Sequence, residues 1–166
     1  MPNVRNSGML VWLTLSVLIL VSDQVTKYLA DEYLSYGIPV KIFSFFNLTL
    51  AYNSGAAFSF LADAGGWQRW FFAIIAFVVS VVLVILIKQM KPHEVWSAIA
   101  LSLILGGAVG NLYDRVALGH VIDFISVHYK HYYFPAFNIA DSAISVGAVM
   151  WIIDTFKRPS DDNSSN

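Results

Sequence analysis

Four long apolar segments alternate with more polar ones along this chain. They cover about residues 9–30, 70–88, 95–114 and 137–156, and the middle two have no charged residue between their ends. Each is close to the ~20 residues with which an α-helix crosses about 30 Å of hydrocarbon. The pattern predicts an all-α polytopic membrane protein with four transmembrane helices, forming a single integral membrane domain over 1–157.

The first segment follows Arg5, as the apolar part of a signal peptide follows its charged start. No pair of small residues marks a cleavage point after it, and Asp23 and Lys27 follow where cleavage would be expected. We therefore expect this segment to be retained as a membrane span.

The composition also favours a lipid environment. The chain is 57% hydrophobic and 13% charged, which is about half the charged fraction of an average soluble domain. The net charge of −1 provides no basic surface for nucleic acid. Because the chain has no cysteine, disulfides, thiolate nucleophiles and thiolate metal sites are excluded.

An even number of spans puts both termini on one side of the membrane. On the side of the termini, the basic residues lie in short segments next to helix ends: Arg5, Lys88, Lys91, Lys157 and Arg158. On the other side they are spread over two longer segments: Lys41, Arg69, Arg115 and Lys130. The positive-inside rule then predicts that both termini are cytoplasmic. Residues 158–166 are polar and are expected to be a disordered cytoplasmic tail.

The segments 31–68 and 115–136 are therefore expected to be external. Residues 40–42 and 48–52 alternate in polarity, which predicts strands of a small external β-cradle. Residues 56–62 are apolar and short, as in an interfacial helix. Aromatic side chains suited to contact with membrane lipid headgroups occur in the first segment: Tyr36, Phe43, Phe45, Phe46 and Tyr52.

Ionisable residues inside a span cost at least ~2.5–3.5 kcal/mol at its centre, so each calls for a partner or a role. Asp23 and Lys27 are four positions apart with the acid first, which is the favourable order for an ion pair on one helix. We interpret them as a structural pair rather than as reacting groups, because buried pairs are more often structural.

Three polar residues close the third span. Asn111 points into the bundle, where its amide must find hydrogen-bond partners. Arg115 can reach back towards the membrane face and donate to carbonyls or to a carboxylate. Asp114 is interpreted as a plain interfacial charge.

Two further acids occur in apolar surroundings on the external side. Asp141 lies about four residues into the fourth span, or ~6 Å below its boundary. Asp123 is the only acid in the apolar run Val121–Ile125. The two acids could meet at one site; alternatively, Asp123 caps a turn and Asp141 binds a neighbouring helix. Spacing alone does not decide between these interpretations.

If the two carboxyl groups do meet, they cannot both ionise and must share one proton. The ionised member can then take a proton from water, while the protonated member donates to a substrate carbonyl oxygen. Aspartic proteases divide the work in this way, and they need neither a metal nor a cofactor.

Other hydrolytic chemistries lack the residues they require. His93–Glu94 begins like a zinc-protease motif, but Ser97 stands where the second histidine would be. His128 and His131 are expected to be solvated rather than to bind metal. No histidine lies within a span to activate an intramembrane serine.

Five short motifs together resemble bacterial lipoprotein signal peptidase, also called signal peptidase II. They occur in the order of that family: DQVTK at 23–27, NSGAAF at 53–58, GNLYDR at 110–115, VIDF at 121–124 and FNIADS at 137–142. Each motif is weak alone, but the set is specific on a four-span chain of this length.

The resemblance implies an aspartic endopeptidase of the bacterial inner membrane. It would remove the signal peptide from a prolipoprotein just before a diacylglyceryl-modified cysteine, and it would be inhibited by cyclic peptides such as globomycin. Asp123 and Asp141 match the catalytic pair. The remaining matches are to positions around the substrate peptide (Asn53, Gly55, Asn111, Arg115 and Asn138) and to a structural support (Asp23 and Lys27). We expect a monomer with no cofactor and no metal.

Two other classes of function remain open from the residues themselves. Ionisable residues within the spans, such as Asp23, Lys27 and Asp141, would suit a small ion- or proton-coupled transporter, although no internal repeat is visible. A non-catalytic membrane scaffold would tolerate substitution of both Asp123 and Asp141.

Overall fold

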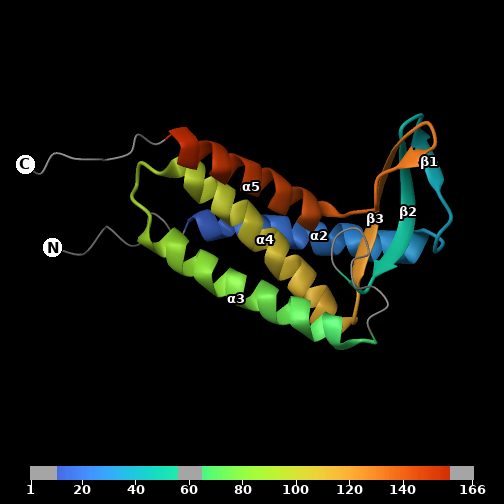
Figure 1. Ribbon diagram of the computed structural model, residues 1–166, viewed down its shortest axis with the longest axis horizontal. Helices are drawn as coiled ribbons and strands as arrows, with labels where there is room; N and C mark the ends of the chain where they lie inside the picture. Colours follow the sequence, from blue (N-terminus) through green and yellow to red (C-terminus); the bar gives the residue numbers. More distant parts are fainter. Residues whose placement is uncertain (1–10, 56–64, 158–166) are drawn as a thin grey trace, which may run out of the picture.

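A computed structural model describes residues 11–55 and 65–157 of the chain. The four long helices lie alongside one another, and a small sheet lies at one end of them (Figure 1). The described chain begins and ends at the opposite end of the bundle. The predicted interfacial helix over 56–62, Arg5 and the polar tail lie outside the described residues.

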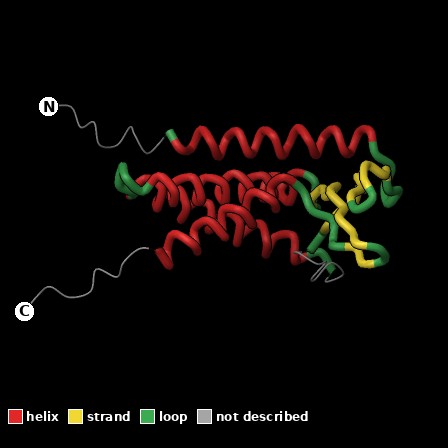
Figure 2. The backbone as a smooth tube through the Cα atoms, turned by 90° about the horizontal axis from the view of Figure 1, so that it is seen from above, coloured by secondary structure: helices red, strands yellow, loops and turns green. Residues whose placement is uncertain are grey.

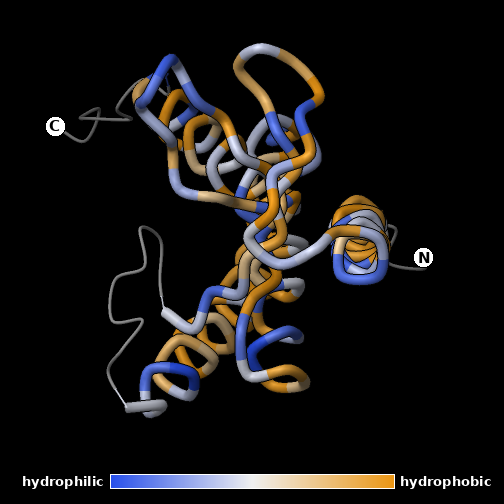
Figure 3. The backbone as a smooth tube through the Cα atoms, turned by 90° about the vertical axis from the view of Figure 1, so that its right-hand side faces the viewer, coloured by the Kyte–Doolittle hydropathy of each residue, from blue (hydrophilic) through white to orange (hydrophobic). Residues whose placement is uncertain are grey.

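The helices are α2 (Trp12–Tyr33), α3 (Trp67–Gln89), α4 (Val95–Ala117) and α5 (Ile139–Lys157). All four are long and apolar enough to span a membrane. In α4, 61% of the most apolar window is buried, against 17–22% in the other three, which makes α4 the centre of the bundle. The helices run side by side in Figure 2, and α2 stands as a separate coil beside the rest in Figure 3. The described structure is therefore the four-helix membrane fold that the sequence predicts.

The outward faces of the helices carry large apolar side chains. Val21 on α2, Ile74 on α3 and Val149 on α5 are each more than half exposed. In water such a surface would be a liability, but in a bilayer the acyl chains cover it. The exposed apolar faces are thus consistent with a multi-pass membrane protein.

Glycines allow the central helix to approach its neighbours closely. A Cβ on Gly106 would lie 2.7 Å from the backbone oxygen of Ser16 on α2, and one on Gly107 would collide with the backbone oxygen of Ala140 on α5. On α5, a Cβ on Gly147 would lie 2.6 Å from the backbone oxygen of Ala100. The glycines at 106 and 107 therefore allow α4 to pack closely against both α2 and α5.

The sheet contains β1 (Val40–Phe43), β2 (Phe46–Asn53), β3 (Val121–Tyr129) and β4 (Tyr132–Tyr133), in that order and all antiparallel. β1 and β2 correspond to the strands predicted from alternation. β3 was not predicted, because its first four residues are all buried and so show no alternation. Its pairing with β2 places Ala51 opposite Asp123, which brings that acid beside the bundle.

The ends of the helices differ from the predicted spans by up to three residues. α3 begins at Trp67 instead of 70 and so includes Arg69, whose charge the prediction had taken as a boundary. α5 begins at Ile139 instead of 137, because Asn138 caps it. α2 and α4 continue to Tyr33 and Ala117, beyond 30 and 114. Polar residues that find partners in the fold can therefore extend a helix past its apolar run.

Candidate active site

Asp141 occupies the first turn of α5, next to the residue that caps the helix. The Asn138 side-chain oxygen accepts the backbone N–H of Asp141 at 2.8 Å, which is the hydrogen bond expected of an asparagine N-cap. An acid in the first turn is also stabilised by the helix dipole. The local sequence therefore fixes both the start of α5 and the position of its acid.

Asp123 projects from β3 into a buried environment, and its residue is 3% exposed. Its two carboxylate oxygens accept hydrogen bonds from the amide nitrogens of Asn53 at 3.1 Å and Asn138 at 2.8 Å. Burial, followed by the nearby charge of Asp141, raises the pKa of Asp123 from 3.8 to about 7. The alternative that Asp123 caps a turn is wrong, because Asp123 is an internal residue of a strand.

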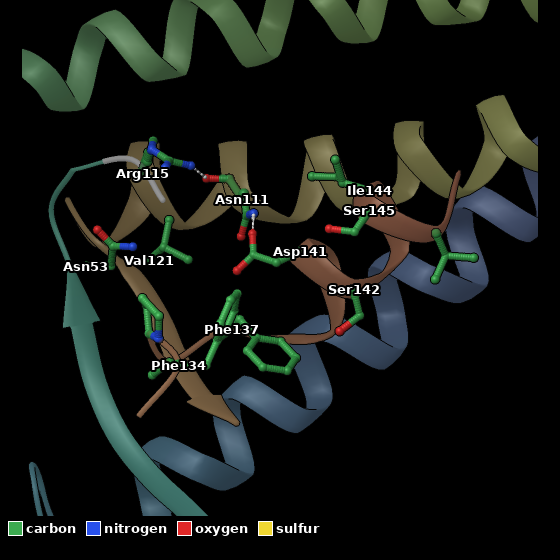
Figure 4. A pocket seen from close by; sticks show the side chains of 13 residues that line it. Asn53, Asn111, Arg115, Val121, Phe134, Phe137, Asp141, Ser142, Ile144 and Ser145 are labelled. Atoms are coloured by element: carbon green, nitrogen blue, oxygen red, sulfur yellow. Dashed lines mark hydrogen bonds between the residues drawn. The ribbon is translucent and has the colours of Figure 1, made fainter. Parts of the chain in front are cut away.

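Asp141 is also held by the central helix. The amide nitrogen of Asn111 on α4 donates to a carboxylate oxygen of Asp141 at 2.8 Å (Figure 4). Asn138 contacts both acids, through its amide nitrogen to Asp123 and its amide oxygen to the backbone of Asp141. The two acids therefore belong to one hydrogen-bonded group that includes a strand and two helices.

Arg115 connects this group to the segment that follows β2. Its guanidinium donates to the backbone oxygens of Gly55 at 3.1 Å and of Asn111 at 3.2 Å. It also lies over the ring of Phe72, 5.5 Å from the centroid. The N–H of Gly55 in turn donates to the side-chain oxygen of Asn53 at 3.0 Å. Asn53 and Gly55 are thus both fixed close to the acids.

A second charged cluster lies just behind the acids. The Lys27 ammonium contacts the carboxylates of Asp23 at 2.8 Å and Asp114 at 2.7 Å, and all three residues are 1% exposed or less. Asp23 and Lys27 form the ion pair that their spacing predicts. The interpretation of Asp114 as an interfacial charge is wrong, because Asp114 is buried and compensates Lys27 from a different helix.

Sequence reasoning missed three contributions to this region, those of Gln24, Arg69 and the buried Asp114. Gln24 donates to Asp114 at 2.9 Å. The guanidinium of Arg69 on α3 binds the last carbonyls of α4, those of Arg115 at 2.6 Å and Val116 at 2.7 Å. For Asp114 a signal existed, since it lies three positions after Asn111 and hence on the same helix face. For Arg69 no local pattern indicates the partner helix.

A cavity of about 640 Å³ opens beside Asp141. Figure 4 shows Asp141 and Asn111 directed towards each other at its centre, with Arg115 and Asn53 at one end and Ser145 on α5 at the other. The lining comprises Asn53, Asn111, Arg115, Val121, Phe134, Pro135, Ala136, Phe137, Asp141, Ser142, Ile144, Ser145 and Val146. The cavity is mostly apolar with a few convergent polar groups, as is usual for a ligand site.

All the residues singled out from the motifs lie in this region. Asn53, Asn111, Arg115 and Asp141 line the cavity, and Asn138 and Gly55 contact residues of that lining. Asp123 lies behind Asn53 and Asn138, and Asp23 with Lys27 lies behind Asn111. Such a constellation can bind an apolar chain next to a pair of carboxyl groups.

Comparison with known proteins gives a consistent result. The family model described as signal peptidase (SPase) II matches residues 15–157. A lipoprotein signal peptidase of Pseudomonas fluorescens is 62% identical over 160 residues, which cover 95% of this chain and 94% of that protein. One of Pseudomonas putida is 59% identical over 158 residues, which cover 94% and 92%.

A solved structure has the same fold. It is described as a bacterial membrane enzyme determined by the in meso method at 2.3 Å resolution, and it is 33% identical with a TM-score of 0.82. The match covers 94% of this chain and 93% of that one. The family model, the relatives and the shared fold together show that the chain belongs to the signal peptidase II family of membrane aspartic peptidases.

Proposed function

We propose that this protein removes the signal peptide from diacylglyceryl-modified prolipoproteins, cutting just before the lipidated cysteine, with Asp123 and Asp141 activating the water. The observation that carries the proposal is the shared bonding of the two acids. Asn138 contacts both of them, and Asp141 faces the apolar cavity. The family's lipoprotein signal peptidases supply the substrate class.

The two acids have different surroundings, which suggests different roles. Asp123 is the more buried, and its pKa of about 7 keeps it protonated in a large fraction of molecules at neutral pH. Asp141 lines the cavity, where substrate and water arrive. We assign the shared proton to Asp123 and the role of general base to Asp141.

The reaction then balances without any other reagent. The Asp141 carboxylate takes a proton from water, whose oxygen bonds to the scissile carbonyl carbon, while Asp123 gives its proton to the carbonyl oxygen. When the tetrahedral diol collapses, the carbon–nitrogen bond breaks and Asp141 protonates the leaving amine. A diol hydroxyl returns its proton to Asp123, which restores the starting state.

The neighbouring polar groups are suited to hold a peptide. Arg115 and Asn53 line the cavity and carry N–H donors, which can bind backbone carbonyls of an extended substrate. Gly55 and Asn138 keep these donors and the acids in place. Globomycin-type cyclic peptides would occupy the same cavity, since it offers both apolar surface and peptide-binding donors.

The apolar cavity also suits a lipid-bearing substrate that enters sideways from the bilayer. Its lining includes Val146, which is 53% exposed on the outer face of α5. We place the protein in the bacterial inner membrane with both termini in the cytoplasm and the sheet on the external face. On this arrangement the site lies close to external water, and a single copy of the chain contains every group required.

The direct test uses purified protein and a diacylglyceryl-modified precursor. Asp123→Asn and Asp141→Asn should each reduce cleavage at least ~1000-fold, because each removes an essential proton carrier. The matched control is Asp31→Asn at the same end of the bundle, which removes an exposed charge but keeps an oxygen that accepts from the Tyr52 hydroxyl, and it should leave cleavage intact. Full activity in either dyad variant would overturn the proposal.

A further inference from the structure

The buried charge of Lys27 bears on the acids through one side chain, that of Asn111. The ammonium of Lys27 lies 3.0 Å from the side-chain oxygen of Asn111. The nitrogen of the same amide donates to Asp141 at 2.8 Å. Lys27 on α2 is therefore joined to Asp141 on α5 through one residue of α4.

The direction of this amide follows from simple chemistry. An asparagine amide has an oxygen that accepts and a nitrogen that donates, and an ammonium group can only donate. With Lys27 on one side, the oxygen of Asn111 must face Lys27, and its nitrogen must face Asp141. If the amide were reversed, two donors would meet at Lys27 and two acceptors at Asp141.

In the other two asparagines of the site, Asn53 and Asn138, the amide is also oriented by a donor that bonds its oxygen, but there the donor is a backbone N–H. The N–H of Gly55 holds the oxygen of Asn53, and the N–H of Asp141 holds the oxygen of Asn138. Both therefore direct their nitrogens at Asp123. Asn111 differs, because the nearer donor to its oxygen is a side-chain charge: the ammonium of Lys27 lies at 3.0 Å, whereas the amide nitrogen of Asn138 donates to the same oxygen at 3.4 Å.

That charge is itself held in place. Lys27 is 1% exposed and is compensated by Asp23 and Asp114. Gln24 donates to Asp114 at 2.9 Å, and Asp23 accepts the backbone N–H of Ala140 in the first turn of α5 at 2.9 Å. The ammonium therefore cannot turn away from Asn111 without leaving two buried carboxylates uncompensated, which is costly.

We propose that Lys27 is a positioning residue for catalysis: it orients the Asn111 amide so that its N–H group donates to Asp141. The inference rests on the proposed role of Asp141 as the base. The N–H of Asn111 needs an acceptor, so the oxygen of Asp141 that it bonds must carry no proton. The same bond holds the carboxyl group in a fixed direction towards the cavity. Two other ionisable groups interact with Asp141 electrostatically, Asp123 from β3 and Arg115 from α4.

A double-mutant cycle tests the chain of contacts. Lys27→Met and Asn111→Ala should each lower kcat by about 10- to 100-fold, the loss expected from one hydrogen bond to a charged group. KM should change less than about threefold, because neither residue is expected to bind the substrate through this contact. If Lys27 acts through Asn111, the double variant should lie within about threefold of Asn111→Ala alone. Losses that multiply in the double variant would overturn the inference.

A second variant keeps the test decisive if Lys27→Met does not fold. Asn111→Asp leaves Lys27 with its two partners Asp23 and Asp114 and keeps an oxygen that accepts from the ammonium, but an ionised carboxylate cannot donate to Asp141. It should lose at least as much kcat as Asn111→Ala. Retention of parental kcat in Asn111→Asp would sink the idea.

The control is a buried polar contact at the other end of the bundle. Ser97 on α4 donates to Asp154 on α5, so Ser97→Ala should lower thermal stability without changing kcat. The outcome for Asp123→Asn and Asp141→Asn separates the two proposals. If both aspartate variants are inactive but the losses of kcat in Lys27→Met and Asn111→Ala multiply in the double variant, only the role of Lys27 is wrong. If either aspartate variant is active, the proposed mechanism itself is wrong.

Discussion

Asn138 donates a 2.8 Å hydrogen bond to the carboxylate of Asp123, and the oxygen of the same amide accepts the N–H of Asp141 at 2.8 Å. One side chain therefore caps α5 and contacts both acids. Capping and orientation of the acids are normally separate tasks, and here they can be separated by mutation.

Asn138→Ser and Asn138→Ala should differ in stability but not in activity. Serine is nearly as good an N-cap as asparagine, so the serine variant should be about 1 kcal/mol more stable than the alanine variant. Neither side chain can reach Asp123 while capping the helix, so both should lose about 10- to 100-fold in kcat. Thermal unfolding in detergent and cleavage rates measure the two effects. Parental kcat in Asn138→Ser would show that the contact with Asp123 is dispensable.

The raised pKa of Asp123 predicts how stability depends on pH. The folded protein keeps a proton on this carboxyl up to about pH 7, whereas an ordinary aspartate releases it near 3.8. Between these values the folded state binds more protons than the unfolded state, so the free energy of unfolding contributed by Asp123 falls as pH rises. Asp123→Asn cannot titrate and should lose this dependence.

The measurement is the unfolding midpoint of Asp123→Asn minus that of the parent, followed from about pH 4 to pH 8. The difference should increase through this range and level off above about pH 7. Asp31→Asn, which substitutes an exposed acid at the same end of the bundle, serves as the reference. A difference that is flat or falls with pH would contradict the assignment of the buried proton.

Gly147→Ala should destabilise the contact between α4 and α5. Alanine in a helix is normally favoured over glycine by about 1 kcal/mol, but here its Cβ would lie 2.6 Å from the backbone oxygen of Ala100. Overpacking of this kind costs about 1–3 kcal/mol. The lipid-facing Val149→Ala should change the midpoint very little. A higher midpoint in Gly147→Ala would mean that the helices can move apart without loss.

Arg69→Ala should loosen the end of α4. Its guanidinium binds the carbonyls of Arg115 and Val116, which have no partner within the helix. We expect the free energy of unfolding to fall by about 1–3 kcal/mol, which lowers the midpoint of thermal unfolding. KM should also rise, because Arg115 moves with the loosened end of α4. Lys41→Ala on the exposed strand β1 is the charge-matched control, and an equal effect there would argue against a specific cap.

The parts of the fold that could be predicted are those that a local pattern determines. Long apolar runs predict the four helices, since in lipid a helix is the way for a single segment to satisfy its backbone hydrogen bonds. β1 and β2 could be predicted because they alternate in polarity, although β1 is exposed along its whole length. β3 could not be predicted, because its start at Val121–Phe124 is buried on both faces and therefore resembles any short apolar run.

The candidate site follows the same division. Asp123 and Asp141 stand out because each is an acid in apolar surroundings. The motif also marks Asn138, but its contact with both acids is seen only once β3 is placed beside the bundle. Asp114 was misinterpreted for a similar reason. Its partner Lys27 lies on another helix, and no periodicity in the chain records which helices are neighbours.

The cluster around Lys27 can be completed only late in the synthesis of the protein, because its members come from three helices. α2 emerges from the ribosome before α4 and α5, with Asp23 and Lys27 but without their partners Asp114 and Ala140. Those partners arrive only when the last span has been inserted. The proposed catalytic site is therefore completed only at the end of biogenesis, and on that proposal a half-inserted chain would be unable to cut other proteins in the bilayer.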